Sequence, residues 1–190
     1  MSMLNADEQK ELIKAAWKSI RHEVCGDALV SNRGQLDRFD TESLLRQPAG
    51  AFVTLYKKGS LRGCLGVIVS EEPLLETVSG IAGRAAIADP RFSPVTEDEL
   101  VGIQIEISIL SPLKEISSIE EIFVGTHGLF IQAGMFRGLL LPQVAVAQRW
   151  NRIQFLEETC IKAGLPPNQW KDPETRIFIF SAEIIKQRIS

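Results

Sequence analysis

The chain has 190 residues, of which 45% are apolar and 24% charged, a balance typical of a globular protein with a substantial buried core. Its net charge of −3 and isoelectric point near 5.5 indicate no basic surface for nucleic acid or anionic lipid, so we expect neither as a partner. No apolar run approaches the roughly 20 residues of a membrane helix, and the polar N-terminus does not resemble a signal peptide. Three widely spaced cysteines favour a reducing, cytoplasmic location over a disulfide framework.

An N-terminal helical segment is predicted for residues 1–48. Asn5 can cap a helix in which apolar residues recur at helical spacing, and Gly26 is a plausible end for it. Residues 31–40 are polar and predicted to be mostly loop. A short helical turn around 41–46 stops before the next proline, because the residue before a proline disfavours the helical conformation.

A hairpin is predicted for residues 51–69, with a polar, glycine-containing turn between two β-prone runs. Side chains alternate along a strand, so Arg62 and Cys64 share one face. A guanidinium beside a thiol favours the reactive thiolate, which makes Cys64 a candidate nucleophile. Gly63 and Gly66 leave room for a backbone or ligand to come close. The alternative is that Cys64 is a small buried apolar residue and Arg62 an ordinary ion-pair partner.

A helix opened by Pro73 carries a broad apolar stripe and should end near Ala88, because Asp89 precedes Pro90. The turn that follows is made rigid by its prolines. In it, Arg91 can bind a carboxylate or phosphate, with Asp89 orienting the guanidinium. The alternative is a structural turn with a local ion pair of the kind common on protein surfaces.

The second half of the chain follows the order of the first. A strand over 101–109 completes the first half. Strands at 129–132 and 136–141 then precede a helix opened by Pro142, and a last strand is predicted for 176–185.

An internal repeat is indicated by the heptad at 59–65, which matches the heptad at 134–140, 75 residues later. The same offset superposes the helix ends and the third strands. We interpret the chain as a single α+β domain, 1–190, with two β-β-α-β repeats at about 51–110 and 126–185 that arose by duplication. The alternative is that hairpins commonly share glycine and apolar residues.

Two further side chains are candidates for the site. His127 lies in a glycine-containing loop and could act as a base for Cys64, although nothing in the sequence shows that they meet; alternatively it is a solvated turn histidine. Gln143 starts the second helix, where unpaired backbone N–H groups can bind an anion, as at any helix start. We find no metal-ligand cluster, P-loop, dinucleotide fingerprint or serine elbow, so we expect no metal and no cofactor.

These motifs resemble those of the AMMECR family, named for a syndrome of Alport nephritis, intellectual disability, midface hypoplasia and elliptocytosis; its prokaryotic members are called AmmeMemoRadiSam system protein A. The resemblance covers almost the whole chain and matches least in the first 50 residues. It implies a duplicated, barrel-like, mainly antiparallel sheet with packed helices, and it supplies no reaction. The residues that carry it are the LRGCLG motif at 61–66 and the segments 89–92, 127–129, 140–145 and 162–165.

The resemblance also implies partners: a Memo-type protein, similar to metal-dependent dioxygenases, and a radical S-adenosylmethionine (SAM) enzyme. We favour an accessory or binding subunit whose cleft around Cys64 receives a partner or a modified intermediate. The alternative is a thiol-dependent enzyme acting on a small acidic substrate. There Cys64 would be the nucleophile or redox thiol, Arg62 would lower its pKa, His127 would be the base and Arg91 would bind the substrate.

Overall fold

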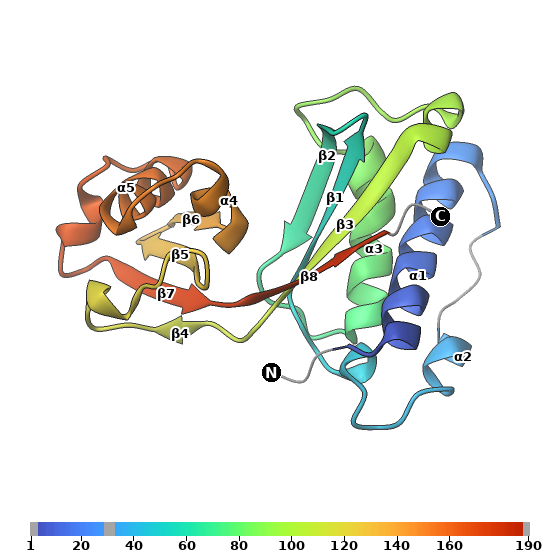
Figure 1. The fold of residues 1–190 in the computed structure, drawn as a ribbon, viewed down its shortest axis with the longest axis horizontal. Helices are drawn as coiled ribbons and strands as arrows, with labels where there is room; N and C mark the ends of the chain where they lie inside the picture. Colours follow the sequence, from blue (N-terminus) through green and yellow to red (C-terminus); the bar gives the residue numbers. More distant parts are fainter. Residues whose placement is uncertain (1–3, 29–32, 188–190) are drawn as a thin grey trace. The chain divides into compact units, whose positions relative to one another are not determined.

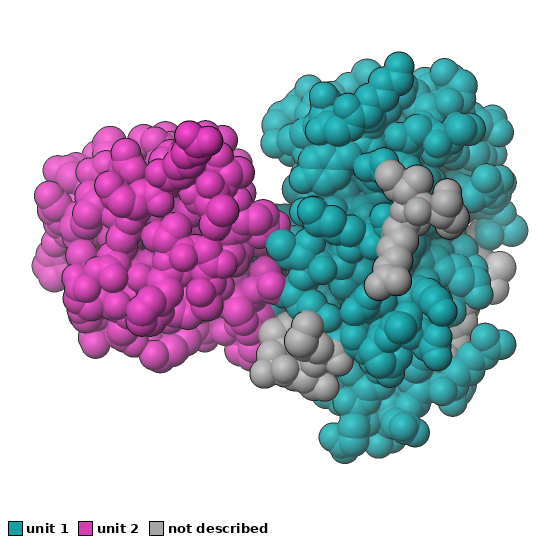
Figure 2. All heavy atoms as spheres, viewed as in Figure 1, with its two compact units in different colours: residues 1–110, 183–190 teal, residues 111–182 magenta. Residues whose placement is uncertain are grey.

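The computed structural model describes residues 4–28 and 33–187, and in it the chain forms two compact units. Unit 1 comprises residues 1–110 and 183–190, and unit 2 comprises residues 111–182 (Figure 2). Each unit has its own four-stranded sheet and its own apolar core (Figure 1). The structure therefore has two separate sheets where we expected one barrel-like sheet.

The first sheet has the strand order β2-β1-β3-β8, and β1 pairs antiparallel with both β2 and β3. Helix α3 packs on β1 and β2, and α1 packs on α3 (Figure 1). The elements of this unit are α1 (Ala6–Cys25), α2 (Arg33–Leu36), the 3-10 helix η1 (Leu44–Arg46), β1 (Ala51–Lys57), β2 (Ser60–Val67), α3 (Leu74–Ile87), the 3-10 helix η2 (Glu97–Gly102), β3 (Ile103–Leu110) and β8 (Ala182–Lys186).

The second sheet has the order β4-β7-β5-β6, and β5 pairs antiparallel with both β6 and β7. Helix α5 packs on the β5–β6 hairpin. The elements of this unit are β4 (Lys114–Glu115), η3 (Ile119–Glu121), β5 (Gly128–Ala133), β6 (Phe136–Leu140), α4 (Pro142–Ala147), α5 (Arg152–Lys162), η4 (Gln169–Lys171) and β7 (Arg176–Phe180).

Local signals placed the first helix and the first hairpin correctly. Asn5 caps α1 through a reciprocal capping box, and Gly26 ends it in the left-handed conformation at φ 75°. The hairpin turn has positive φ at Lys58 and Gly59, the geometry that matches the twist of two short-linked strands. Helix α3 ends at Ile87, one residue before the predicted end.

Three predicted elements differ from the structure. The predicted loop at 31–40 lies partly outside the described residues, and its described part contains α2. The predicted second helix is two helices, because Arg149 adopts a positive φ of 57° and Asn151 caps a new helix. The predicted last strand is also divided, since β7 and β8 belong to different sheets.

The two units share the order hairpin, helix, third strand, although their registers differ. When Gly63 and Gly138 are superposed, the strand pairings make Ile105 equivalent to Ile177 and not to Phe180, as the constant offset required. The offset of 75 residues therefore holds for the hairpin glycines and the helix ends but fails at the third strand.

The glycine common to both heptads is explained by packing. A Cβ atom on Gly63 would lie 2.3 Å from the Ala85 carbonyl oxygen of α3. On Gly138 it would lie 2.6 Å from the Thr159 carbonyl oxygen of α5. In each unit, a glycine on the second strand therefore lets the following helix approach the sheet.

We predict that Gly63→Ala lowers the free energy of unfolding by at least about 2 kcal/mol, because the helix backbone must move to admit a methyl group. Gly80→Ala is the matched control, since Gly80 lies on α3 with open space around its Cα. That change should raise stability by about 0.5–1 kcal/mol through helix propensity. Urea unfolding measures both values, and an unchanged midpoint for Gly63→Ala would contradict the packing account.

Candidate functional site

Cys64 lies in the middle of β2, on the face of the sheet opposite α3. Its register partner on β1 is Thr54, which in turn lies opposite Glu106 on β3, so these three side chains form a row across the sheet. The Thr54 hydroxyl donates a hydrogen bond to the Cys64 sulfur at 3.3 Å. Glu106 pairs with Lys186 of β8 at 3.2 Å. Cys64 is half-buried, whereas Thr54 and Glu106 are buried.

Asp89 links the end of α3 to the outer edge of β2. The helix ends at Ala88, and the next residue turns its carboxylate toward the strand. That carboxylate accepts the backbone N–H of Cys64 at 2.8 Å, a donor that points away from β1. Asp89 is only 4% exposed, so its charge needs the partners that the turn provides.

Those partners come from Arg91. Its Nε and Nη2 donate to the two oxygens of Asp89 at 3.0 and 2.7 Å, and its backbone N–H donates at 3.0 Å. The Arg91 hydrogen bond is the main reason that the pKa of Asp89 lies well below its usual range, and burial opposes this shift. The Asp89–Arg91 ion pair proposed from the sequence is therefore present, and it is bidentate.

Arg91 is also the guanidinium next to the thiol. Its pKa is raised mainly by the hydrogen bond to Asp89 and to a smaller extent by the Cys64 sulfur. The Arg91 side chain is 51% exposed, and Nη1 is not among the atoms that contact Asp89. One face of the guanidinium fork is thus held, and the remaining donors are available to another group.

Arg62 has a different role from the one we expected. Its Nε and Nη2 donate to Glu99 at 3.0 and 2.8 Å, and Nη1 and Nη2 donate to the carbonyls of Ser93 and Pro94. These bonds fasten the loop before η2 to β2. Arg137, which holds the same place in the second heptad, is exposed. The two arginines are therefore not equivalent anchors.

His127 belongs to unit 2, in the loop before β5. Its Nδ1 accepts the backbone N–H of Phe123 at 3.2 Å, which leaves the proton of a neutral ring on Nε2. Cys64 belongs to unit 1, so neither unit alone contains the proposed nucleophile–base pair, and that pair stays a prediction.

The remaining predicted residues lie in two places. Gly66 is covered by the Phe52 ring, because a Cβ there would lie 2.3 Å from a ring carbon. Gln143 is the second residue of α4, which has only six residues. A helix this short has a weak dipole, so we place no anion site at its start.

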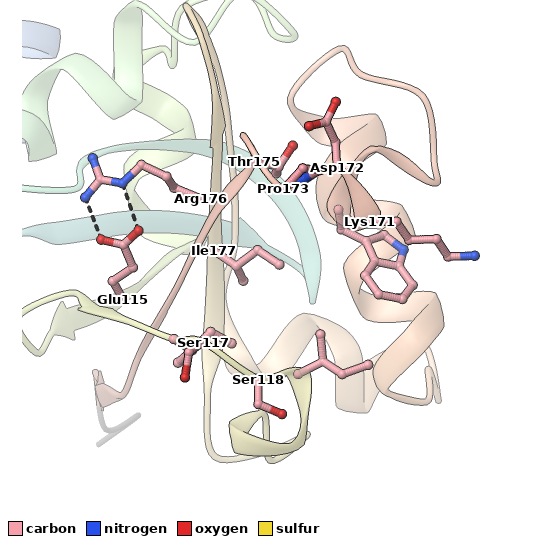
Figure 3. A pocket seen from close by; sticks show the side chains of 12 residues that line it. Glu115, Ser117, Ser118, Lys171, Asp172, Pro173, Thr175, Arg176 and Ile177 are labelled. Atoms are coloured by element: carbon pink, nitrogen blue, oxygen red, sulfur yellow. Dashed lines mark hydrogen bonds and ion pairs between the residues drawn. The ribbon is translucent and has the colours of Figure 1, made fainter.

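A groove in unit 2 was not foreseen from the sequence. It has a volume of about 550 Å³ and lies between residues 115–119 and 170–177, two segments far apart in the chain. Figure 3 shows Arg176 and Glu115 facing each other across it, joined at 2.9 and 2.6 Å. These two charges are used by each other, so they do not point to a ligand of either sign.

Two searches were confined to residues 4–28 and 33–187. Within these ranges, no group of three or more His, Cys, Asp or Glu side chains could hold a metal ion. No helix of the described chain is both long enough and apolar enough to span a membrane.

We predict an acid-induced loss of stability that depends on Asp89. Because its folded pKa is lowered, its contribution is complete above the unfolded value of about 3.9 and is lost as the pH falls below that value. Asp89→Asn should therefore flatten the fall in urea midpoint between about pH 5 and 2, with about 2 kcal/mol lost at neutral pH. The exposed Asp40→Asn is the control, and equal acid profiles for the two variants would contradict the assignment.

A family model described as AMMECR1 matches residues 13–185. A protein of Methanothermobacter thermautotrophicus is 42% identical over 190 residues, covering 97% of this chain and 96% of the relative. A protein of Methanopyrus kandleri is 36% identical, covering 97% and 90%. The crystal structure of an uncharacterised protein of Pyrococcus horikoshii is similar with a TM-score of 0.83 and 34% identity, covering 93% of this chain and 90% of that one.

Proposed function

The chain belongs to the AMMECR1 family, and from that premise we propose that it is a cytoplasmic accessory or binding subunit that recognises an anionic group at the Cys64–Asp89–Arg91 cluster. The observation that carries this proposal is that Asp89 holds the Arg91 guanidinium beside the Cys64 thiol. A guanidinium fixed before binding loses little freedom on meeting a carboxylate or phosphate.

The distribution of the histidines supports binding over catalysis. His22 lies in α1, where its Nδ1 contacts the Asp27 carbonyl at 2.6 Å, and His127 lies in unit 2. Unit 1 thus holds the thiol and the cation without an imidazole hydrogen-bonded to the sulfur among its described contacts. A site of this kind can recognise an acidic group without transferring a proton.

The proposed partners are the Memo-type protein and the radical SAM enzyme implied by the family resemblance. Their acidic segment, or an acidic intermediate that they produce, would contact Arg91. We further propose that the two units arose by duplication, with the shared strand order and the shared hairpin glycine in support. The anion site would then have been added to one copy, because Leu139 stands where Cys64 does.

We predict that isothermal titration calorimetry with the Memo-type protein and radical SAM enzyme of the same organism detects binding. Arg91→Gln should weaken this binding about tenfold or more, because it removes a preset cation from the contact. The control is Arg84→Gln, since Arg84 is exposed on α3 of the same unit. No binding by the unmodified protein, or equal binding by both variants, would contradict the accessory function.

A second candidate function is thiol-dependent catalysis on a small acidic substrate. The observation that favours it is that the Cys64 sulfur accepts the Thr54 hydroxyl and adjoins a cation, two contacts that stabilise a thiolate. Burial raises the pKa of the other two thiols, Cys25 and Cys160.

We predict that Cys64 is alkylated fastest of the three, as measured by peptide mass spectrometry. The anionic reagent iodoacetate should gain on neutral iodoacetamide at Cys64, since Arg91 attracts its carboxylate, and Arg91→Gln should remove that preference about tenfold. Cys160 reacting as fast as Cys64 would exclude the active thiol. A small-molecule turnover abolished by Cys64→Ala, with no partner binding, would favour the enzyme over the accessory subunit.

A further inference from the structure

A groove of about 530 Å³ lies in unit 1 between α1 and β8, away from the residues of the Cys64 cluster. Its volume is within the range of small-molecule sites, roughly 300–1,000 Å³. The walls come from one face of the helix and from the last residues of the strand: Ala6, Gln9, Lys10, Ile13, Lys14 and Trp17 on α1, and Ile185, Lys186 and Gln187 at the end of β8.

The floor of the groove is apolar and fixed in place. Helix α1 uses one stripe to pack in the core, and Ile13 and Trp17 form a second, half-buried stripe beside it. The Trp17 Nε1 donates to the Gln187 side-chain oxygen at 3.0 Å, which holds the indole against the end of the strand. Ile185 is buried below them. The contact surface exists before any ligand binds, so binding would require little ordering of side chains.

The rim of the groove is basic. Lys10, Lys14 and Lys186 have side chains that are 79%, 57% and 72% exposed. Each contacts one carboxylate at 3.2–3.6 Å, an interaction of small energy at such exposure. An ammonium has three donors, so each lysine can still bind a second oxygen.

We propose that this groove binds a small amphipathic carboxylate, with the acyl or aryl part on the Ile13–Trp17 floor and the carboxylate among the lysines. A cationic rim around an apolar floor is complementary to a molecule that carries one negative charge at the end of an apolar body. The length of the site argues against a macromolecule, because the α1 wall from Ala6 to Trp17 spans only about 17 Å. A stable protein interface needs about 800 Å² from each partner.

The test is calorimetric titration of the full chain with sodium decanoate, with neutral decanol as the second ligand. Decanoate should bind with a dissociation constant below about 1 mM, and decanol should bind at least about tenfold more weakly. The double variant Lys10→Gln, Lys14→Gln should weaken decanoate binding about tenfold. A matched control, Lys58→Gln with Lys162→Gln, removes the same charge at exposed positions elsewhere and should bind normally.

A second measurement locates the ligand. Trp150 and Trp170 lie in unit 2, so decanoate should change the fluorescence of the unmodified protein and leave that of Trp17→Phe unchanged. No binding of decanoate overturns the proposal. Equal affinity for decanol, equal weakening in the control, or binding only to anionic vesicles and not to monomeric decanoate would do so too. These outcomes do not involve Cys64 or Arg91, so they are independent of the accessory function.

Discussion

The carboxylate of Asp89 is the contact on which the candidate site depends. It accepts an outward N–H of the edge strand β2 and both ends of the Arg91 fork, while being almost fully buried. A buried charge of this kind is tolerated only with complete hydrogen bonding. The same bonds fix the turn after α3, protect part of the strand edge and set the guanidinium beside the thiol. Fold and site therefore share one interaction.

The LRGCLG motif combines several separate requirements. Gly63 admits the backbone of α3, and Gly66 lies under the Phe52 ring. Arg62 holds the loop before η2 through Glu99. Of the motif residues discussed, Cys64 is the one whose side chain meets the Asp89–Arg91 pair. Most of this motif is thus explained by folding, and its chemical content rests on one thiol that gains a cation from a different loop.

Sequence patterns predicted the fold where the cause is local. Asn5 and Gly26 bound α1, and the Lys58–Gly59 turn fixes the first hairpin, because capping and turn geometry depend on neighbouring residues. The patterns failed where the cause is distant. A divided last strand and two separate sheets arise from pairing between remote segments. Within the site, the Asp89–Arg91 pair was predictable because two residues separate its members. The choice of Arg91 over Arg62 as the thiol's neighbour was not, because only the folded turn brings residue 91 to β2.

Hydrogen exchange of the Cys64 amide tests the central role of Asp89 most directly. An N–H on the outer edge of a sheet exchanges quickly with solvent unless something else accepts it. If Asp89 accepts this donor, the Cys64 amide should exchange slowly in the unmodified protein and much faster in Asp89→Ala, while the amide of Leu55 on the central strand β1 stays protected in both. An amide of Cys64 that exchanges equally fast in the two proteins would contradict the account.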